Sequence, residues 1–411
     1  QSRGVFRMKV DPNSAGFCDQ RLERISEHLE RNYIAPGKIP GCQVSVGRRG
    51  HLAYHRSFGF ADKEREVPVD DDTIFRIYSM SKPITSIALM MLFEEGRLQL
   101  TDPVHKFIPS WKSQQVWVKG EGENMELRSP IEPVSIAHLL THMSGLTYGE
   151  SLFPSDHPVD KLYGSIREDK KSLVAFVDEL SRIPLRFDPG ARWCYSLATD
   201  VCGALVEIIS GQPFSEFLSE RIFEPLEMYD TAFTISNDKV PRFAANYERD
   251  ENKNLVLIDD PVESVYSESG RLQSGGGGLL STTADYSKFC EMLLGGGKYL
   301  GCRIIGDRTL KMMCQNHLPK NADLASVAMG SFSETAYEGV GFGLGFAQTL
   351  SEVRAQNLGA GDFYWGGMAS TIFWVDPKEN MYCVFMTQLV PSTTFNFRGQ
   401  LKSLVYSSIE D

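Results

Sequence analysis

The sequence predicts an α+β fold, in which helices flank an antiparallel β-sheet and a mostly helical domain is inserted into the sheet domain. Three observations predict it. β-rich runs lie near both ends of the chain, helical spacing with long loops dominates between them, and 411 residues suffice for one large or two ordinary domains. We therefore expect a sheet domain of residues 1–78 and 270–411, a helical domain of residues 79–269, and a functional site at their seam.

The N-terminal part of the sheet domain is predicted to be a helix followed by a hairpin. In residues 18–34, CDQRLERISEHLERNYI, the apolar side chains of Leu22, Ile25 and Leu29 recur at helical spacing. The runs CQVSVGRR and HLAYHRSFGFA are rich in β-forming residues and meet at residues 48–50, which predicts the hairpin.

The middle of the chain is predicted to be helical. The expected helices are residues 83–95, 136–142, 171–180, 197–210 and 214–222, several of which end at a glycine. Long connections rich in Pro, Gly and Asp separate them, such as residues 148–165, YGESLFPSDHPVDKLYGS. Loops of that length in a compact protein are usually functional, and the loop from Tyr148 to Tyr163 is a candidate wall of the pocket.

The C-terminal part returns to strands. The stretch SGGGGLLSTTADYSKFCEMLLGGG predicts a helix that begins at Thr282 or Thr283 and runs to Gly295. The runs GFGLGFAQTL, FYWGGMASTIFWVDP and NMYCVFMTQL predict three antiparallel strands, of which the last two are joined by a turn at residues 376–380. A final helix, NFRGQLKSLVYSSI, closes the chain.

The composition excludes several classes of partner. The chain has 42 Lys and Arg against 53 Asp and Glu and no basic block, so we expect neither nucleic acid nor an anionic membrane as partner. Its longest apolar run, SIALMMLF, is far shorter than the roughly 20 residues of a membrane span. The first ten residues lack the apolar core of a signal peptide, and we expect a cytoplasmic protein. Eight scattered cysteines without a C-x-x-C pair favour buried free thiols.

The stretch RIYSMSKPITSIALMMLFEEG contains a Ser-x-x-Lys pattern at Ser79 and Lys82. Pro83 is tolerated only in the first turn of a helix, so Ser79 lies at a helix N-terminus, and residues three apart share one helical face. The positive helix end and the apolar surroundings disfavour the ammonium form of Lys82, and a neutral lysine can accept the serine proton. A capping serine beside a solvated lysine fits the same residues equally well.

Two other patterns are weaker candidates. Ser236 and Lys239 have the same spacing, but they lie in a polar stretch that ends at a proline, with no apolar helix after it. His138 and His142 are four apart, as in a zinc-binding helix, yet the glutamate of a metalloprotease and a third ligand are missing. We expect structural histidines, no metal and no organic cofactor. No Gly-x-Ser-x-Gly motif of the commoner serine hydrolases occurs in the chain.

Two further stretches complete a pattern: WCYSLATDVCG, with Tyr195, and FYWGGMAS, with Trp365, Gly366 and Gly367. In this order and at these intervals, the motifs resemble those of family VIII carboxylesterases. These enzymes belong to the serine β-lactamase and penicillin-binding-protein superfamily and are close to class C β-lactamases. The resemblance spans nearly the whole chain, because HLLTHMSGL, DPGARWCYS and GGGGLLSTTADY also resemble stretches of that family. It implies a β-lactamase/transpeptidase-like fold.

The resemblance also implies roles for the motif residues. Ser79 would be the nucleophile that forms an acyl-enzyme, Lys82 its proton acceptor, and Tyr195 the partner base. The backbone N–H groups of Ser79 and Met368 would form the oxyanion hole, with Gly366 and Gly367 allowing close approach of the strand. Taken alone, Tyr195 fits a tyrosine packed at the domain seam better than a base, and the order of the motifs reverses that preference. Trp365 can be a core aromatic as well as a pocket wall.

The chain departs from the β-lactamases at two positions. Class C β-lactamases and D-alanyl-D-alanine peptidases have Lys-Thr-Gly where this chain has Trp365-Gly366-Gly367, and Tyr-x-Asn where it has Leu197 in the third place. Both changes remove polar recognition of a charged, amide-bearing substrate, which predicts neutral apolar acyl groups. We expect hydrolysis of small-molecule short-chain esters with little β-lactam turnover. The alternatives are a β-lactamase, a D-amino-acid peptidase or an acyltransferase of the same fold, or an inactive binding protein.

Overall fold

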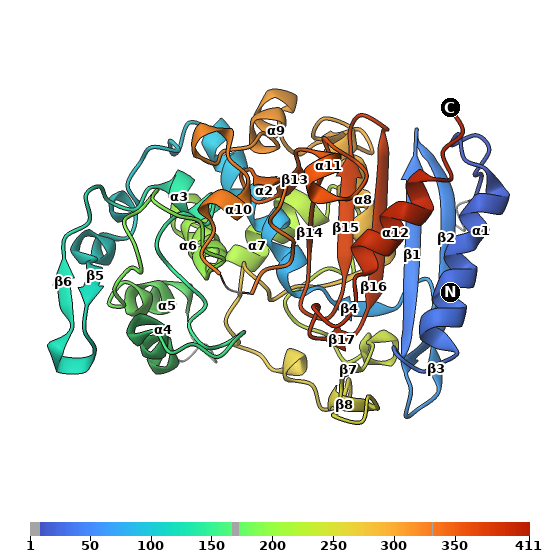
Figure 1. Cartoon of the computed structure of the whole chain (residues 1–411), viewed down its shortest axis with the longest axis horizontal. Coiled ribbons are helices and arrows are strands. Elements are labelled where there is room, and N and C mark those ends of the chain that lie inside the picture. Colours follow the sequence, from blue (N-terminus) through green and yellow to red (C-terminus); the bar gives the residue numbers. More distant parts are fainter. Residues whose placement is uncertain (1–8, 167–171, 331) are drawn as a thin grey trace.

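A computed structural model describes residues 9–166, 172–330 and 332–411. Its largest element is an eight-stranded antiparallel sheet of order β12-β13-β14-β15-β16-β1-β2-β3 (Figure 1). The strands are β1 (Gly41–Arg48), β2 (His51–Asp62), β3 (Val67–Pro68), β12 (Val340–Phe342), β13 (Ala347–Thr349), β14 (Phe363–Gly366), β15 (Ile372–Asp376) and β16 (Met381–Thr387). Because β1 pairs with β16, the sheet is built from both ends of the chain, as predicted.

Helices cover both faces of this sheet. Helices α1 (Asp19–Leu29) and α12 (Phe397–Tyr406) pack together on one face, and α8 (Thr283–Leu294) lies behind the sheet in Figure 1. Strands β1 and β16 are therefore buried along their whole length, which explains the nearly continuous apolar sequence of β16. Helix α8 begins as predicted, because the Thr282 hydroxyl accepts a hydrogen bond from the backbone N–H of Asp285.

Two of the three predicted C-terminal strands are each a pair of strands. The run FYWGGMASTIFWVDP forms β14 and β15, which are joined by a turn at residues 367–371, and GFGLGFAQTL forms β12 and β13. The prediction of single strands was wrong. The chain can reverse there because Ser370 and Gly345 have positive φ angles of 71° and 96°. The predicted turn between β15 and β16 is confirmed.

The predicted helices of the middle region are present. Helix α2 (Ser81–Glu94) is buried on all sides as far as Leu92 and packs against α6 (Ala198–Ser210). The other helices are α3 (Ile136–Leu140), α4 (Pro158–Leu162), α5 (Leu173–Leu180), α7 (Phe214–Leu218), α9 (Asp307–Met313), α10 (Leu324–Val327) and α11 (Glu352–Ala355). The predicted start of α5, Lys171, lies outside the described residues. The expected helix ends at residues 30–34 and 219–223 are π-helical turns.

Several short strands were not predicted. They are β4 (Ile74–Arg76), which pairs with β9 (Leu280–Thr282), the hairpin β5 (Val116–Lys119) and β6 (Glu126–Arg128), the hairpin β10 (Lys298–Tyr299) and β11 (Cys302–Arg303), and a small sheet of β7 (Asn246–Arg249), β8 (Leu255–Asp259) and β17 (Leu389–Val390). The β4–β9 pairing has a consequence for the site. It brings the chain before Ser79 beside the chain that follows a glycine-rich turn, residues 274–278.

Two further observations concern the cysteines and the apolar character of the helices. All eight cysteines are free thiols, and five of them are buried. Within the described ranges, none of the helices combines the length and the apolar character that a membrane span requires.

Candidate active site

Ser79 and Lys82 lie where the chain enters the buried helix α2. Ser79 belongs to a 3-10 turn, Tyr78–Met80, that leads directly into α2, and Lys82 is in the first turn of that helix. The Lys82 Nζ lies 3.0 Å from the Ser79 Oγ and donates a hydrogen bond to it. Tyr78 has a positive φ of 39°, a conformation that is uncommon for residues other than glycine. The predicted contact between the two side chains is thus present, at a tight bend of the chain.

Two further acceptors surround the Lys82 amine. It donates to the hydroxyl of Tyr148 and to the carbonyl of Gly276, both at 2.6 Å. Burial lowers the pKa of Lys82 to about 7, although the carboxylates of Asp200 and Glu334 oppose the shift. A large fraction of this lysine is therefore neutral near pH 7.

Tyr195 lies on the other side of Ser79. Its hydroxyl donates to the Ser79 Oγ at 2.6 Å and accepts a hydrogen bond from the Trp365 indole at 3.2 Å. Burial, and after it the negative charge of Glu334, raise the pKa of Tyr195. The phenol is therefore protonated at neutral pH, and the Ser79 oxygen is held between a lysine and a tyrosine.

The end of strand β14 packs directly against the segment before Ser79. A Cβ atom on Gly367 would lie 2.3 Å from the Ile77 carbonyl oxygen, so no other residue fits without moving the backbone. Trp365 is buried, and its ring contacts those of Tyr195 and Phe342. It is a core aromatic that also supports the site. Met368 follows Gly367 and is partly buried.

Three contributors to this arrangement were not predicted: the contact of Tyr148 with Lys82, the side chain of Asp200 and the glycine-rich turn 274–278. Asp200, in the first turn of α6, accepts hydrogen bonds from the Ser274 hydroxyl and the Gly276 N–H. It thereby fixes the turn whose carbonyl binds Lys82. The run of four glycines, residues 275–278, was the available signal in the sequence.

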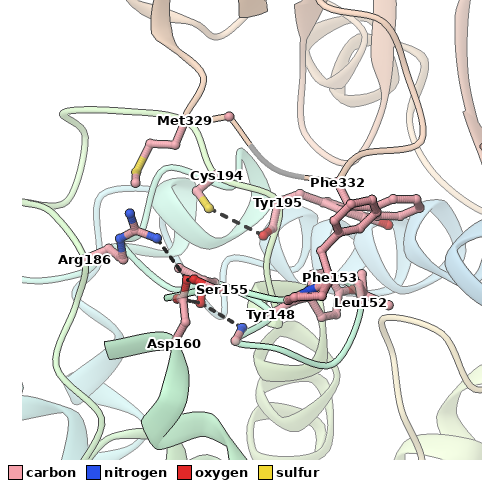
Figure 2. Close-up of a pocket in the computed structure, with 14 residues that line it drawn as sticks. Tyr148, Leu152, Phe153, Ser155, Asp160, Arg186, Cys194, Tyr195, Met329 and Phe332 are labelled. Atoms are coloured by element: carbon pink, nitrogen blue, oxygen red, sulfur yellow. Dashed lines mark hydrogen bonds and ion pairs between the residues drawn. The ribbon is translucent and has the colours of Figure 1, made fainter. Parts of the chain in front are cut away.

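A cavity of about 250 Å³ adjoins these residues (Figure 2). Tyr148 and Tyr195 line it on the side of Ser79, and Phe153 and Phe332 add aromatic surface. Half of its lining residues come from residues 148–163, the loop that was predicted to be a wall. The cavity is therefore next to the hydroxyl groups that contact Ser79 and Lys82.

A family model described as Beta-lactamase matches residues 27–405. The chain belongs to the beta-lactamase family. Because this match covers most of the chain, it also confirms the predicted fold class.

Three similar proteins indicate which members of the beta-lactamase family this chain resembles. Esterase EstB of Burkholderia gladioli is 30% identical over 398 residues, which cover 92% of this chain and 93% of EstB. Lovastatin esterase of Penicillium rubens is 27% identical over 383 residues, 90% of this chain and 94% of that protein. The structure of EstCE1, titled a hydrolase with promiscuous acyltransferase activity, has a TM-score of 0.78 and 27% identity, and covers 94% of this chain and 99% of its own. The predicted resemblance to family VIII carboxylesterases is confirmed.

The other candidate residues of this beta-lactamase-family chain are engaged elsewhere. Lys239 donates to the Tyr229 carbonyl at 2.8 Å and pairs with Asp230, instead of contacting the Ser236 side chain. His142 is buried, with its Nδ1 3.1 Å from the Ser196 hydroxyl and its ring against Tyr195.

His138 has a structural contact of its own, because its Nδ1 accepts from the Ser135 N–H and closes a capping box at the start of α3. Among the residues that the structure describes, no group of three or more His, Cys, Asp or Glu side chains is arranged to hold a metal ion.

Proposed function

We propose that the protein is a serine carboxylesterase that cleaves short-chain carboxylic esters through an acyl-enzyme on Ser79. One observation carries the proposal: the Ser79 Oγ has two proton-transfer groups within hydrogen-bond distance, Lys82 at 3.0 Å and Tyr195 at 2.6 Å. The esterase names of the relatives EstB and lovastatin esterase support the same reaction class.

In the first half-reaction, neutral Lys82 takes the proton of Ser79 while the Oγ attacks the ester carbonyl. Lys82 is the better acceptor of the two neighbours, because burial lowers its pKa to about 7 and raises the pKa of Tyr195. Tyr195 then donates its proton to the departing alkoxide, so that the alcohol leaves and the acyl group stays on Ser79. Tyr148 contacts both Lys82 and Tyr195, which gives the lysine proton a path to the tyrosine.

In the second half-reaction, water replaces the alcohol and the same groups act in reverse. Water loses a proton to the base formed by Lys82 and Tyr195, attacks the acyl ester, and releases the carboxylic acid and Ser79. The backbone N–H groups of Ser79 and Met368 would bind the carbonyl oxygen as it gains negative charge. Close packing of Gly367 on Ile77 supports this role, because it holds the end of β14 against the nucleophile segment.

The same acyl-enzyme can pass its acyl group to an alcohol other than water. EstCE1 is described as a hydrolase with promiscuous acyltransferase activity, which makes acyl transfer the second candidate for this chain. Adding a primary alcohol to the assay separates the two, because transfer yields a new ester and hydrolysis yields free acid.

The reaction class is tested with 4-nitrophenyl acetate and butyrate beside a chromogenic cephalosporin. We expect rapid ester cleavage, little cephalosporin turnover, and a loss of roughly 10³-fold or more in kcat for Ser79→Ala, since Ser79 supplies the covalent route. Ser236→Ala removes the serine of the second Ser-x-x-Lys pattern and should keep the wild-type rate. Fast cephalosporin turnover without ester cleavage would contradict the esterase proposal.

A further inference from the structure

The cavity that Tyr148 and Tyr195 line has a polar side that the proposed mechanism does not use. Opposite the aromatic pair Phe153 and Phe332, it is lined by Ser155, Asp160 and Arg186 (Figure 2). Its volume of about 250 Å³ exceeds the roughly 30 Å³ of one water molecule severalfold, so a substrate arm of several non-hydrogen atoms fits. The arm would start at the tyrosines that contact Ser79 and Lys82 and end at this polar side.

Asp160 is satisfied without a ligand. Its buried carboxylate accepts hydrogen bonds from the hydroxyls of Thr147 and Ser155, at 2.7 and 2.6 Å, and from the Nη1 of Arg186 at 3.0 Å. These three donors explain why a carboxylate is stable at this place, and they tie the loop of residues 147–160 to Arg186. Asp160 thereby holds the arginine in position.

The guanidinium of Arg186 has more N–H donors than its contact with Asp160 uses. Its side chain is 22% exposed, and with other described residues its guanidinium makes only the contact to Asp160 through Nη1. A guanidinium carries five N–H donors in a rigid plane, so its Nε and Nη2 edges remain for another acceptor. Since Arg186 lines the cavity, that acceptor belongs to whatever occupies it.

We propose that Arg186 forms a subsite for an uncharged oxygen acceptor, such as a second ester carbonyl, a ketone or a hydroxyl, at the far end of the substrate arm. The proposal rests on the esterase function and names its substrate class: esters whose arm is apolar near the reacting carbonyl and oxygenated at its end. A neutral acceptor fits better than a carboxylate, because Asp160 already balances the arginine charge and a second anion would lie within reach of the first.

The subsite is tested with substrate pairs of equal length. Dimethyl succinate, glutarate and adipate place a second carbonyl at three distances, and methyl alkanoates of matched length lack it. We expect the best diester to exceed its matched alkanoate in kcat/KM by roughly tenfold, the size expected for one hydrogen bond to a charged donor. Monomethyl glutarate, which carries a carboxylate, should be no better than the alkanoate.

The variants remove the donors without leaving a buried charge alone. The double variant Arg186→Met with Asp160→Asn should lose the diester preference and keep alkanoate hydrolysis within about threefold. Arg186→Lys keeps the ion pair with Asp160 but lacks the planar set of N–H donors, so its preference for diesters should fall as well. This single variant gives an independent test if the double variant folds poorly. Arg182→Met removes an exposed arginine from the same segment and should keep the preference.

The outcomes separate this inference from the proposed function. Equal rates for diesters and alkanoates at every length, a preference that survives in Arg186→Lys and the double variant, or a preference for the carboxylate substrate would each overturn the subsite while leaving the esterase intact. Failure to cleave any ester of either series would overturn both.

Discussion

At the scale of single residues, the chemistry depends on the ionisation of Lys82. The residue is 2% exposed, and its amine contacts three oxygens, those of Ser79, Tyr148 and Gly276. Burial lowers its pKa to about 7, and only the neutral form can accept a proton from Ser79. Because the group loses its proton as pH rises through 7, activity should increase in that direction.

We therefore expect kcat/KM for 4-nitrophenyl butyrate to rise with pH around a midpoint of about 7. No fall is expected below about pH 10, because burial raises the pKa of Tyr195 above the ordinary value of a phenol, about 10. Lys82→Arg, which stays protonated, should lose roughly 10²- to 10⁴-fold at every pH, the usual contribution of a general base. A pH–rate profile of both proteins measures this, and a maximum near pH 5 would rule out Lys82 as the proton acceptor.

Spacing in the sequence predicted the local part of this site, the family resemblance added Tyr195, and the contacts of Lys82 with Tyr148 and Gly276 were missed. Ser79 and Lys82 are three residues apart, so helical geometry alone places them together. The partners Tyr148 and Gly276 are 66 and 194 residues from Lys82. No spacing rule connects residues so far apart, and a tyrosine before a long loop resembles any other loop residue. The roles of Ser79, Lys82, Tyr195 and Met368 stay predictions until they are measured.

At the scale of elements, the glycine-rich turn 274–278 positions the lysine. A Cβ on Gly276 would lie 2.5 Å from the Asp200 Oδ2, whereas a Cβ on Gly277 would have its nearest neighbour at 3.8 Å. The two glycines are adjacent but differ in the space beside them, which provides a matched pair of substitutions.

We expect Gly276→Ala to lower kcat by roughly tenfold or more, because the methyl group displaces Asp200 or moves the carbonyl that binds Lys82. Gly277→Ala should stay within about threefold of wild type. Steady-state kinetics with thermal melting distinguish this effect from unfolding. Equal activity of the two folded variants would show that the turn does not position Lys82.

For the longer elements, the sequence predicted whether a segment is a helix or a strand better than it predicted the first and last residues of that segment. Long, mostly apolar helices, such as α2 and α6, lie within two residues of their expected bounds. The composition of the run that contains β14 and β15 predicts one strand, because the reversal at residues 367–371 depends on Ser370 adopting a positive φ. An Asn-Gly pair in the sequence predicts a hairpin turn, but a serine with a positive φ, such as Ser370, does not.

At the scale of the whole molecule, the site exists only where five separate segments meet. One of them, the loop that begins at residue 148, supplies the Tyr148 hydroxyl that contacts Lys82. The start of α2 supplies Ser79 and Lys82, the segment before α6 supplies Tyr195, the turn 274–278 supplies the Gly276 carbonyl, and the end of β14 supplies Trp365. Pairing of both chain ends in one sheet was predictable from their β-rich runs.

The proposed domain bounds remain predictions. Part of the segment expected to be helical, residues 246–259, forms β7 and β8, and β7 pairs with β17, which directly follows β16 of the main sheet. Short, half-exposed strands of this kind carry too few residues to show a clear alternation.

The most direct test of the whole account is the site of covalent labelling by a fluorophosphonate, read by intact mass and peptide mapping. The account predicts one phosphonyl group per chain, located on Ser79, absent in Ser79→Ala and retained in Ser236→Ala. Labelling that persists in Ser79→Ala, or that maps to another residue in the wild-type protein, would contradict it.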